Sequence, residues 1–293
     1  MDVIAPQQRQ RRAIGLKALA AAFAVAACMP TSEAPAQPLP SGASLFADTP
    51  SGQWQLPHRL REISGLAMTA DGRVFAHNDE RAEIYEINPR DGTVGKAFSL
   101  GTPTLHGDFE DIAIAPNGDF YLTTSTGVLY QFREGTDGAH VTYQSFDTGL
   151  RQRCEIEGLA YLRADDTLIL ACKTNYEHRH TVAFYAWSLR DHRLNSTPWL
   201  TMPAASLGAA AGVRGFRTSA LTIDPRTGRL IVLAARERIM AEIDRSGRIQ
   251  ALRRLTPDHV QAEGAVVLSD GSLLVSDEGR DSHALLTRYP RRT

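Results

Sequence analysis

The sequence predicts an all-β fold made of repeated four-stranded sheets, and three observations support this. A short motif, clearest as EIEGLA at residues 155–160, returns in altered form so that there are five copies. Their intervals of 46, 47, 62 and 44 residues are typical of a repeat architecture. Between the copies, short runs alternate apolar and polar residues and end at Asp-Gly, Asn-Gly or Pro-x-x-Gly turns, a pattern of β-hairpins rather than helices.

Each of the first four repeats contains four predicted strands. They cover residues 64–68, 73–77, 83–87 and 96–100; then 110–115, 120–124, 128–132 and 141–146; then 157–162, 167–172, 181–187 and 194–200; then 219–223, 229–234, 240–244 and 249–253. Four antiparallel strands per repeat is the composition of a β-propeller blade. The third repeat is longer, and we expect its Ala- and Gly-rich segment 202–215 to be a loop insertion.

The fifth repeat supplies only three strands, at 264–268, 272–276 and 284–288. One further strand, 53–57, precedes the first repeat and has no blade of its own. If this strand completes the last blade, the ring closes and no exposed sheet edge remains. The sequence therefore predicts a five-bladed β-propeller over residues 52–293, closed by an N-terminal strand.

The N-terminus resembles an export signal. Basic residues at positions 9, 11, 12 and 17 precede an apolar stretch, 18–27, which is too short to span a bilayer as a mature helix. The sequence VAAC at 25–28 resembles the lipobox of bacterial lipoproteins. We expect residues 1–27 to be a lipoprotein signal peptide and Cys28 the lipidated first residue, facing the periplasm of the cell envelope. The alternative is an ordinary secretory signal cleaved near 34–37.

Residues 28–51 are rich in Pro, Ser, Ala and Thr, and we predict a flexible tether there. The formal net charge of −1 gives no reason to expect a nucleic acid as partner. The expected contact with a membrane is through Cys28. After export, Cys154 and Cys172 would meet an oxidising compartment and could form a disulfide, and the alternative is two buried thiols.

The motif copies carry a family resemblance. At the third residue of the motif, called the key position below, the five copies carry Ser64, Glu110, Glu157, Ser219 and Glu263. This order resembles the SdiA-regulated family of YjiK-like proteins. The resemblance also includes HNDE at 77–80, LTIDPRTG at 221–228, QAEG at 261–264 and SDE at 276–278. The resemblance covers about residues 58–290. It implies a five-bladed propeller, a calcium site and distant kinship to NHL-repeat propellers, but no established activity. The chain departs from the family pattern at 124–125 and 235–237.

The first strand of each blade lines the central channel, so Glu110, Glu157 and Glu263 are expected to share one ring. Glu62 and Asp108 lie two residues before the key position, on the same strand face. Crowded carboxylates need a cation or protonation, and oxygen ligands suit Ca²⁺. We expect Ca²⁺ to bind among these five residues. The alternative is that the repeated Ser and Glu satisfy backbone groups of the neighbouring blade.

The ends of the second strands form another convergent set, a candidate site for a polar ligand or else an ion-paired rim. It comprises Asn78, Asp79, Lys173, Arg236, Asp277 and Glu278. His106 and His259 precede channel glutamates and are candidate acid–base groups. The sequence contains no nucleophile elbow, zinc-protease motif or phosphate loop, and no catalytic residue is assigned.

These features predict an exported, lipid-anchored propeller that binds calcium at its channel. We expect it to act as a non-catalytic binding or scaffold protein for an unidentified ligand or envelope protein. The alternative is a metal-dependent hydrolase of the lactonase- or phytase-like propeller type.

Overall fold

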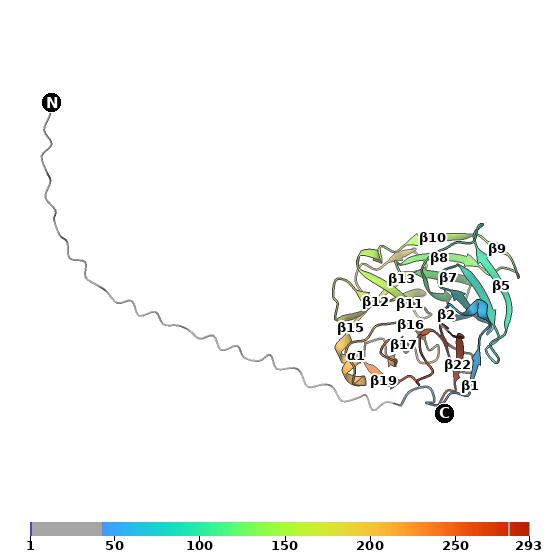
Figure 1. The fold of residues 1–293 in the computed structure, drawn as a ribbon. Coiled ribbons are helices and arrows are strands. Elements are labelled where there is room, and N and C mark those ends of the chain that lie inside the picture. The colour runs from blue at the N-terminus through green and yellow to red at the C-terminus, as the bar shows by residue number, and fades with distance from the viewer. Residues whose placement is uncertain (2–42, 281, 293) are drawn as a thin grey trace. The chain divides into compact units, whose positions relative to one another are not determined.

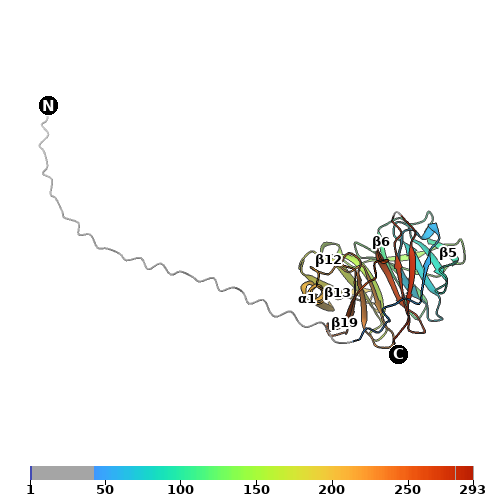
Figure 2. The same cartoon turned by 60° about the horizontal axis from the view of Figure 1, so that its bottom comes forward.

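The computed structural model describes Met1, residues 43–280 and residues 282–292. The predicted signal peptide, Cys28 and most of the predicted tether lie outside these residues. Figure 1 shows small antiparallel sheets arranged around a central axis, and Figure 2 shows the same ring turned by 60°. Five sheets form five blades, so the predicted five-bladed β-propeller is confirmed.

The first three blades are consecutive in the chain, and each begins with the strand nearest the axis. Blade 1 contains β2 (Ile63–Met68), β3 (Val74–Asn78), β4 (Glu83–Ile87) and β5 (Val94–Leu100), with β9 (His140–Val141) parallel to β5. Blade 2 contains β6 (Phe109–Ile114), β7 (Asp119–Thr124), β8 (Val128–Arg133) and β10 (Tyr143–Asp147). Blade 3 contains β11 (Cys154–Leu162), β12 (Thr167–Asn175), β13 (Thr181–Ser188), β14 (Arg193–Leu194) and β15 (Leu200–Pro203).

The last two blades complete the ring. Blade 4 contains β16 (Ala220–Ile223), β17 (Leu230–Ala234), β18 (Ile239–Ile243) and β19 (Ile249–Arg254). Blade 5 contains β20 (Ala262–Val267), β21 (Leu273–Asp277), β22 (Leu285–Tyr289) and, outermost, β1 (Gly52–Gln55). β1 pairs antiparallel with β22, placing Trp54 opposite Leu286. The N-terminal strand therefore closes the last blade as predicted.

Two details of the third repeat differ from the prediction. The expected strand 194–200 is divided into β14 and β15, with Pro198, which cannot donate a ladder hydrogen bond, between them. The expected loop 202–215 contains a helix, α1 (Ala204–Ala211), because alanine has the highest helix propensity. Gly212 ends this helix in the left-handed conformation, at φ 67°. The remaining helical elements are single 3₁₀ turns, η1 (His58–Leu60) and η2 (Leu150–Gln152).

The folded domain begins before residue 52, which corrects the predicted boundary of the tether. Phe46 is fully buried in the same apolar cluster as Leu273 and Tyr289. The buried Glu242 carboxylate accepts hydrogen bonds from the Ser44 hydroxyl and from the Leu45 amide, the latter at 2.8 Å. This packing could not be predicted from the sequence, because the segment has no apolar periodicity. One aromatic ring and hydrogen bonds to one buried carboxylate attach it to the ring of blades.

The apolar core lies between the blades. Five clusters of buried side chains are present in the described chain, one at each junction between neighbouring sheets. For example, Ile169 of blade 3 and Val232 of blade 4 belong to one cluster, and Phe75 of blade 1 and Phe120 of blade 2 belong to another. Each blade therefore depends on both neighbours to bury its two faces.

A buried carboxylate lies at the axis. At the position after the key residue, four blades have Gly65, Gly158, Ala220 and Gly264, whereas blade 2 has Asp111. Asp111 is fully buried and accepts the Ile112 amide at 2.8 Å and the Leu159 amide at 2.7 Å. Burial raises its pKa, and these amides together with that of Leu221 oppose the rise. A Cβ at Gly65 would lie 2.1 Å from the Asp111 carboxylate, so glycine is required opposite it.

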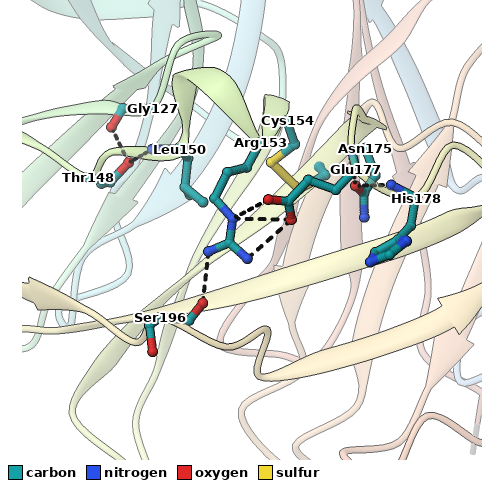
Figure 3. The surroundings of a disulfide bond; sticks show 10 residues. Gly127, Thr148, Leu150, Arg153, Cys154, Asn175, Glu177, His178 and Ser196 are labelled. Carbon is teal, nitrogen blue, oxygen red and sulfur yellow. Dashed lines mark hydrogen bonds and ion pairs between the residues drawn. A yellow bond between two sulfur atoms is a disulfide. The ribbon is translucent and has the colours of Figure 1, made fainter.

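Figure 3 shows a disulfide at the entry to blade 3. Cys154 and Cys172 are bonded across β11 and β12, with Cα atoms 5.7 Å apart, within the usual range for such bonds. Beside the bond, the Arg153 guanidinium contacts the Glu177 carboxylate at 3.2 Å and donates to the Ser196 carbonyl at 2.8 Å. The start of β11 is therefore fixed covalently and by charge. None of the helices in the described residues has the length and apolar character needed to cross a membrane.

The packing of Phe46 predicts a large loss of stability for Phe46→Ala, on the order of 3 kcal/mol, because a buried aromatic side chain is removed. Urea unfolding of the full chain measures the loss. Thr49→Ala, at an exposed position in the same segment, should change stability by less than about 0.5 kcal/mol. Equal stability of the two variants would show that the segment is a tether after all.

The axial carboxylate predicts that Asp111→Asn destabilises the domain by about 2–3 kcal/mol, since an amide NH₂ would replace one acceptor among backbone N–H donors. The matched control is Asp137→Asn, because the exposed Asp137 accepts one backbone amide, from Ala97, at 2.9 Å. The control should lose less than about 1 kcal/mol in the same unfolding experiment. Similar losses for both variants would contradict the axial role.

Candidate functional site

The predicted channel residues lie at β-bulges. In β6, Phe109 pairs with Thr124 and Asp111 with Thr123, so Glu110 has no partner in the ladder. Glu157 in β11 and Glu263 in β20 are skipped by the pairing in the same way. A bulge bends its strand and redirects the side chain of the extra residue. In blades 1, 2, 3 and 5 the repeated motif therefore coincides with a shift in the pairing register, whereas in blade 4 the strand β16 begins after Ser219 and pairs without a shift.

The two serines in this ring serve the backbone of the next blade. The Ser64 hydroxyl donates to the Glu110 carbonyl at 2.7 Å, and the Ser219 hydroxyl donates to the Ala262 carbonyl at 2.7 Å. Ser219 also accepts the Ala235 amide at 3.0 Å. The two serine copies of the motif therefore satisfy backbone groups of the neighbouring blade, which was the alternative to a calcium site.

The three glutamates are buried near one another, and each has a raised pKa. Burial raises the pKa of Glu110 to about 10, and the charges of Glu157 and Asp108 add to the rise. Burial also raises the pKa of Glu157 to about 7, although its carboxylate contacts the Lys173 ammonium. The pKa of Glu263 is raised to about 8, first by burial and then by Glu278. Each of these carboxylates is more stable protonated, or beside a cation, than as an isolated anion.

A second group of oxygen atoms lies beside Glu263. Burial, Glu62 and Glu278 raise the pKa of Asp79 to about 6. The Gln261 side-chain NH₂ donates to Glu263 at 2.5 Å and also contacts Glu278. Asp79 Oδ1 and Gln261 Oε1 are buried without a hydrogen-bond partner in the described part of the chain. Such unpaired buried acceptors require an explanation, and a bound ion is one.

The geometry is not that of a preformed metal centre. Within residues 43–280 and 282–292, no group of three or more His, Cys, Asp or Glu side chains is placed to hold a metal ion. Lys173 supplies a positive charge to Glu157, and Glu62 is paired with Arg61 at 3.0 Å. The donor set, carboxylate and amide oxygens, fits Ca²⁺, but the carboxylates would have to move inward to share one ion.

Several predicted ligand residues have structural contacts instead. Asn78 Oδ1 accepts the Glu80 and Arg81 amides at 3.0 and 2.8 Å, which closes the turn after β3. Asp277 is buried and accepts the Gln261 amide at 3.2 Å. Arg236 is exposed. Of the predicted set, the structure therefore brings Asp79, Lys173 and Glu278 to the carboxylates.

The histidines are placed differently from what the sequence suggested. His259 is buried between Asp277 and the Tyr289 hydroxyl, at 2.6 Å from each, and supports the loop that leads into β20. His106 is exposed. His77, for which no separate role was predicted, accepts the Gly65 amide at 3.0 Å, and burial lowers its pKa to about 4. It is therefore a neutral support for the bulge of blade 1.

The Asp108 carboxylate is exposed and accepts a hydrogen bond from the Ser125 hydroxyl. Ser125 is one of the positions at which the chain departs from the family pattern. Because a hydroxyl stands where an acidic residue was expected, Asp108 accepts a hydrogen bond there and does not face a second carboxylate. Asp108 still adds to the pKa rise of Glu110, so it belongs to the edge of the cluster.

The comparisons with known proteins agree with this architecture. Residues 54–280 match the sequence profile of the SdiA-regulated family. Among curated proteins, none has a significant sequence match to the chain. A PQQ-bound aldose sugar dehydrogenase from Streptomyces coelicolor is similar in structure, with a TM-score of 0.55, 10% identity, and coverage of 85% of this chain and 99% of that one.

A luciferin-regenerating enzyme is also similar, with a TM-score of 0.51, 8% identity, and coverage of 82% of this chain and 92% of that one. Identities this low indicate a shared fold and carry no activity across. The family match, in contrast, is a match of sequence. It spans most of the chain and includes all five copies of the motif. The protein is a member of the SdiA-regulated family.

Proposed function

We propose that this protein is a calcium-binding, non-catalytic binding propeller of the bacterial cell envelope, held at the membrane through a lipidated Cys28. Its partner would be an unidentified ligand or envelope protein that meets the channel mouth. The observation that carries the calcium proposal is the convergence of Glu110, Glu157 and Glu263 from three blades. A ring that only joined blades could have used serine in every copy of the motif, as two copies do.

The residues that would hold the ion follow from the contacts. Glu110 and Glu263 bring carboxylates that lack a full counter-charge, and the unpaired oxygens of Asp79 and Gln261 lie in the same cluster. A bound Ca²⁺ would supply the missing positive charge and join the inner strands of separate blades. Glu157 is held by Lys173, and it would contribute only if that ion pair opened.

The contacts favour binding over hydrolysis. A hydrolytic propeller needs an acid–base group beside the ion. Of the two histidines predicted for that role, His259 is engaged by Asp277 and Tyr289, and His106 is exposed. The metal-dependent hydrolase stays a second prediction, and Glu110, whose raised pKa suits an acid, would be its proton donor. Hydrolysis of an ester or phosphoester by the parent protein in CaCl₂, abolished in Glu110→Gln, would favour that second prediction.

The anchor proposal rests on the sequence of the signal segment, in which basic residues, an apolar stretch and VAAC precede a Pro-rich region. The folded domain starts near Ser44, so about fifteen residues would separate the lipid from the ring. The channel mouth could then reach partners at the membrane surface or away from it.

The raised carboxylate pKa values predict how metal-free stability depends on pH. A carboxyl group whose folded pKa is raised stabilises the fold while protonated, and this stability is lost as the pH rises through the folded value. For Glu157 and Glu263 these values are about 7 and 8. We expect the melting temperature in EDTA to fall between pH 5 and pH 9. Adding 10 mM CaCl₂ at pH 8 should raise it by about 5 °C, and by much less at pH 5.

The variant Glu263→Gln tests whether the calcium-dependent rise in melting temperature comes from the proposed site or from a general effect of ions. This variant should melt higher than the parent protein in EDTA at pH 8, because one crowded charge is gone, and it should lose most of the calcium response. Asp191→Asn, at an exposed turn of blade 3, should behave like the parent. The calcium proposal is wrong if 10 mM CaCl₂ gives no shift, or if Glu263→Gln responds as fully as the parent.

The anchor is tested with Cys28→Ser expressed in a Gram-negative host. Because the lipid would attach to the Cys28 thiol, the variant should lose labelled palmitate and leave the membrane fraction. The control Ser32→Ala should keep both. A parent protein that is found unlabelled in the soluble periplasmic fraction would instead support the ordinary secretory signal.

A further inference from the structure

The channel has a second chemical compartment at the end opposite the carboxylates. All five inner strands run in the same direction along the axis, so their first residues, with the motif, meet at one end and their last residues at the other. A cavity of about 430 Å³ lies at this second end, bounded by the last residues of β2, β6, β11, β16 and β20 and by the turns that follow them. This volume is within the range of small-molecule sites.

The cavity exists because one position of the motif carries small residues. The residues three after the key position are Ala67, Ala113, Ala160, Thr222 and Val266, and all of them line the cavity. Each of these residues is buried and keeps a few per cent of its surface accessible. Larger side chains here would fill the axis, as in a closed barrel core. The remaining lining is mostly apolar and includes Met68, Ile114 and Tyr161.

The cavity is separated from the channel mouth. Between them the inner strands approach closely, since a Cβ at Gly158 would lie 2.7 Å from the Leu221 Cβ. The Asp111 carboxylate and its amide donors occupy the axis at this level. A molecule in the cavity would therefore not touch the carboxylates, and its binding does not depend on calcium.

The charged groups around the cavity favour an anion at its rim. Arg163 and Arg245 are exposed lining residues, and Arg245 is also paired with Asp165. Asp224 lines the wall, but it is fully buried and bonded to the Arg291 guanidinium at 2.9 Å. Tyr161 donates its hydroxyl to Asp166 at 2.9 Å, which offsets that acid in part. Arg163 is therefore placed to meet a negative group at the opening.

We propose that this cavity binds an amphipathic organic anion, a molecule with a small apolar body and one carboxylate or sulfonate. The apolar body would lie against the alanine positions, and the charged group would lie at the rim beside Arg163. An apolar cavity of this size gains little from water, whereas an apolar ligand removes its lining from solvent. The ligand class follows from the lining and the rim together.

The probe is 8-anilinonaphthalene-1-sulfonate, titrated by fluorescence into the full chain in EDTA, with sodium decanoate as competitor. We expect saturable binding of one probe per chain, unchanged by 1 mM CaCl₂ and displaced by decanoate. Ala160→Leu should weaken probe binding at least tenfold by filling the cavity, and Arg163→Gln about threefold, as for one exposed ion pair. Matched controls are Ala209→Leu, at an exposed position of α1, and Arg190→Gln, at an exposed outer turn.

Ala113→Leu repeats the filling test from another blade, and thermal melting of both variants shows that they are folded. If neither leucine variant folds, decanoate competition and Arg163→Gln on the otherwise native chain decide the question. The proposal fails if the probe does not saturate, if either folded leucine variant binds as the parent does, or if decanoate does not compete. It also fails if Arg163→Gln and Arg190→Gln bind the probe equally well.

Discussion

A carboxylate at the axis organises the centre of this propeller. Asp111 accepts amides from β6 and β11, and the Leu221 amide of β16 also acts on it, so one side chain links three inner strands. The neighbouring blades accommodate it with small residues at the equivalent position. Because burying a carboxylate is costly unless donors satisfy it, the arrangement holds only while the strands keep their register. The Asp111 carboxylate lies between the glutamates at one end of the channel and the cavity at the other end.

The sequence was sufficient for the fold because period and turn chemistry are local. The repeated motif marks every blade, Gly turns mark all but the third, and the unpaired strand near Trp54 could complete only one sheet. What the sequence could not show depends on contacts between distant residues. The burial of Phe46 needs Tyr289, and the role of Asp111 needs Leu159, which belongs to another blade. In the sequence, Asp111 could not be distinguished from a second acid beside Glu110.

The site was predicted in part for the same reason. Glu110, Glu157 and Glu263 could be placed on one ring because the motif repeats, and the structure brings them together at bulges. The periodic pattern did not separate residues that face the channel from residues that close a turn. Asn78 and Asp277 end the strands β3 and β21, directly before Asp79 and Glu278, but their side chains accept backbone amides. A one-residue difference at a strand end decides this, and spacing alone does not resolve it.

Closure by β1 also affects the order in which the ring can form. Ser51, beside β1, bonds to Arg288, 237 residues later in the chain, so the first strand has to wait for the last. Contacts of such long range slow folding, because the chain loses conformational entropy on loop closure before the stabilising contacts form. Blade 5 cannot be completed while the C-terminus is still being synthesised. The chain therefore remains an open ring until its final strand has been made.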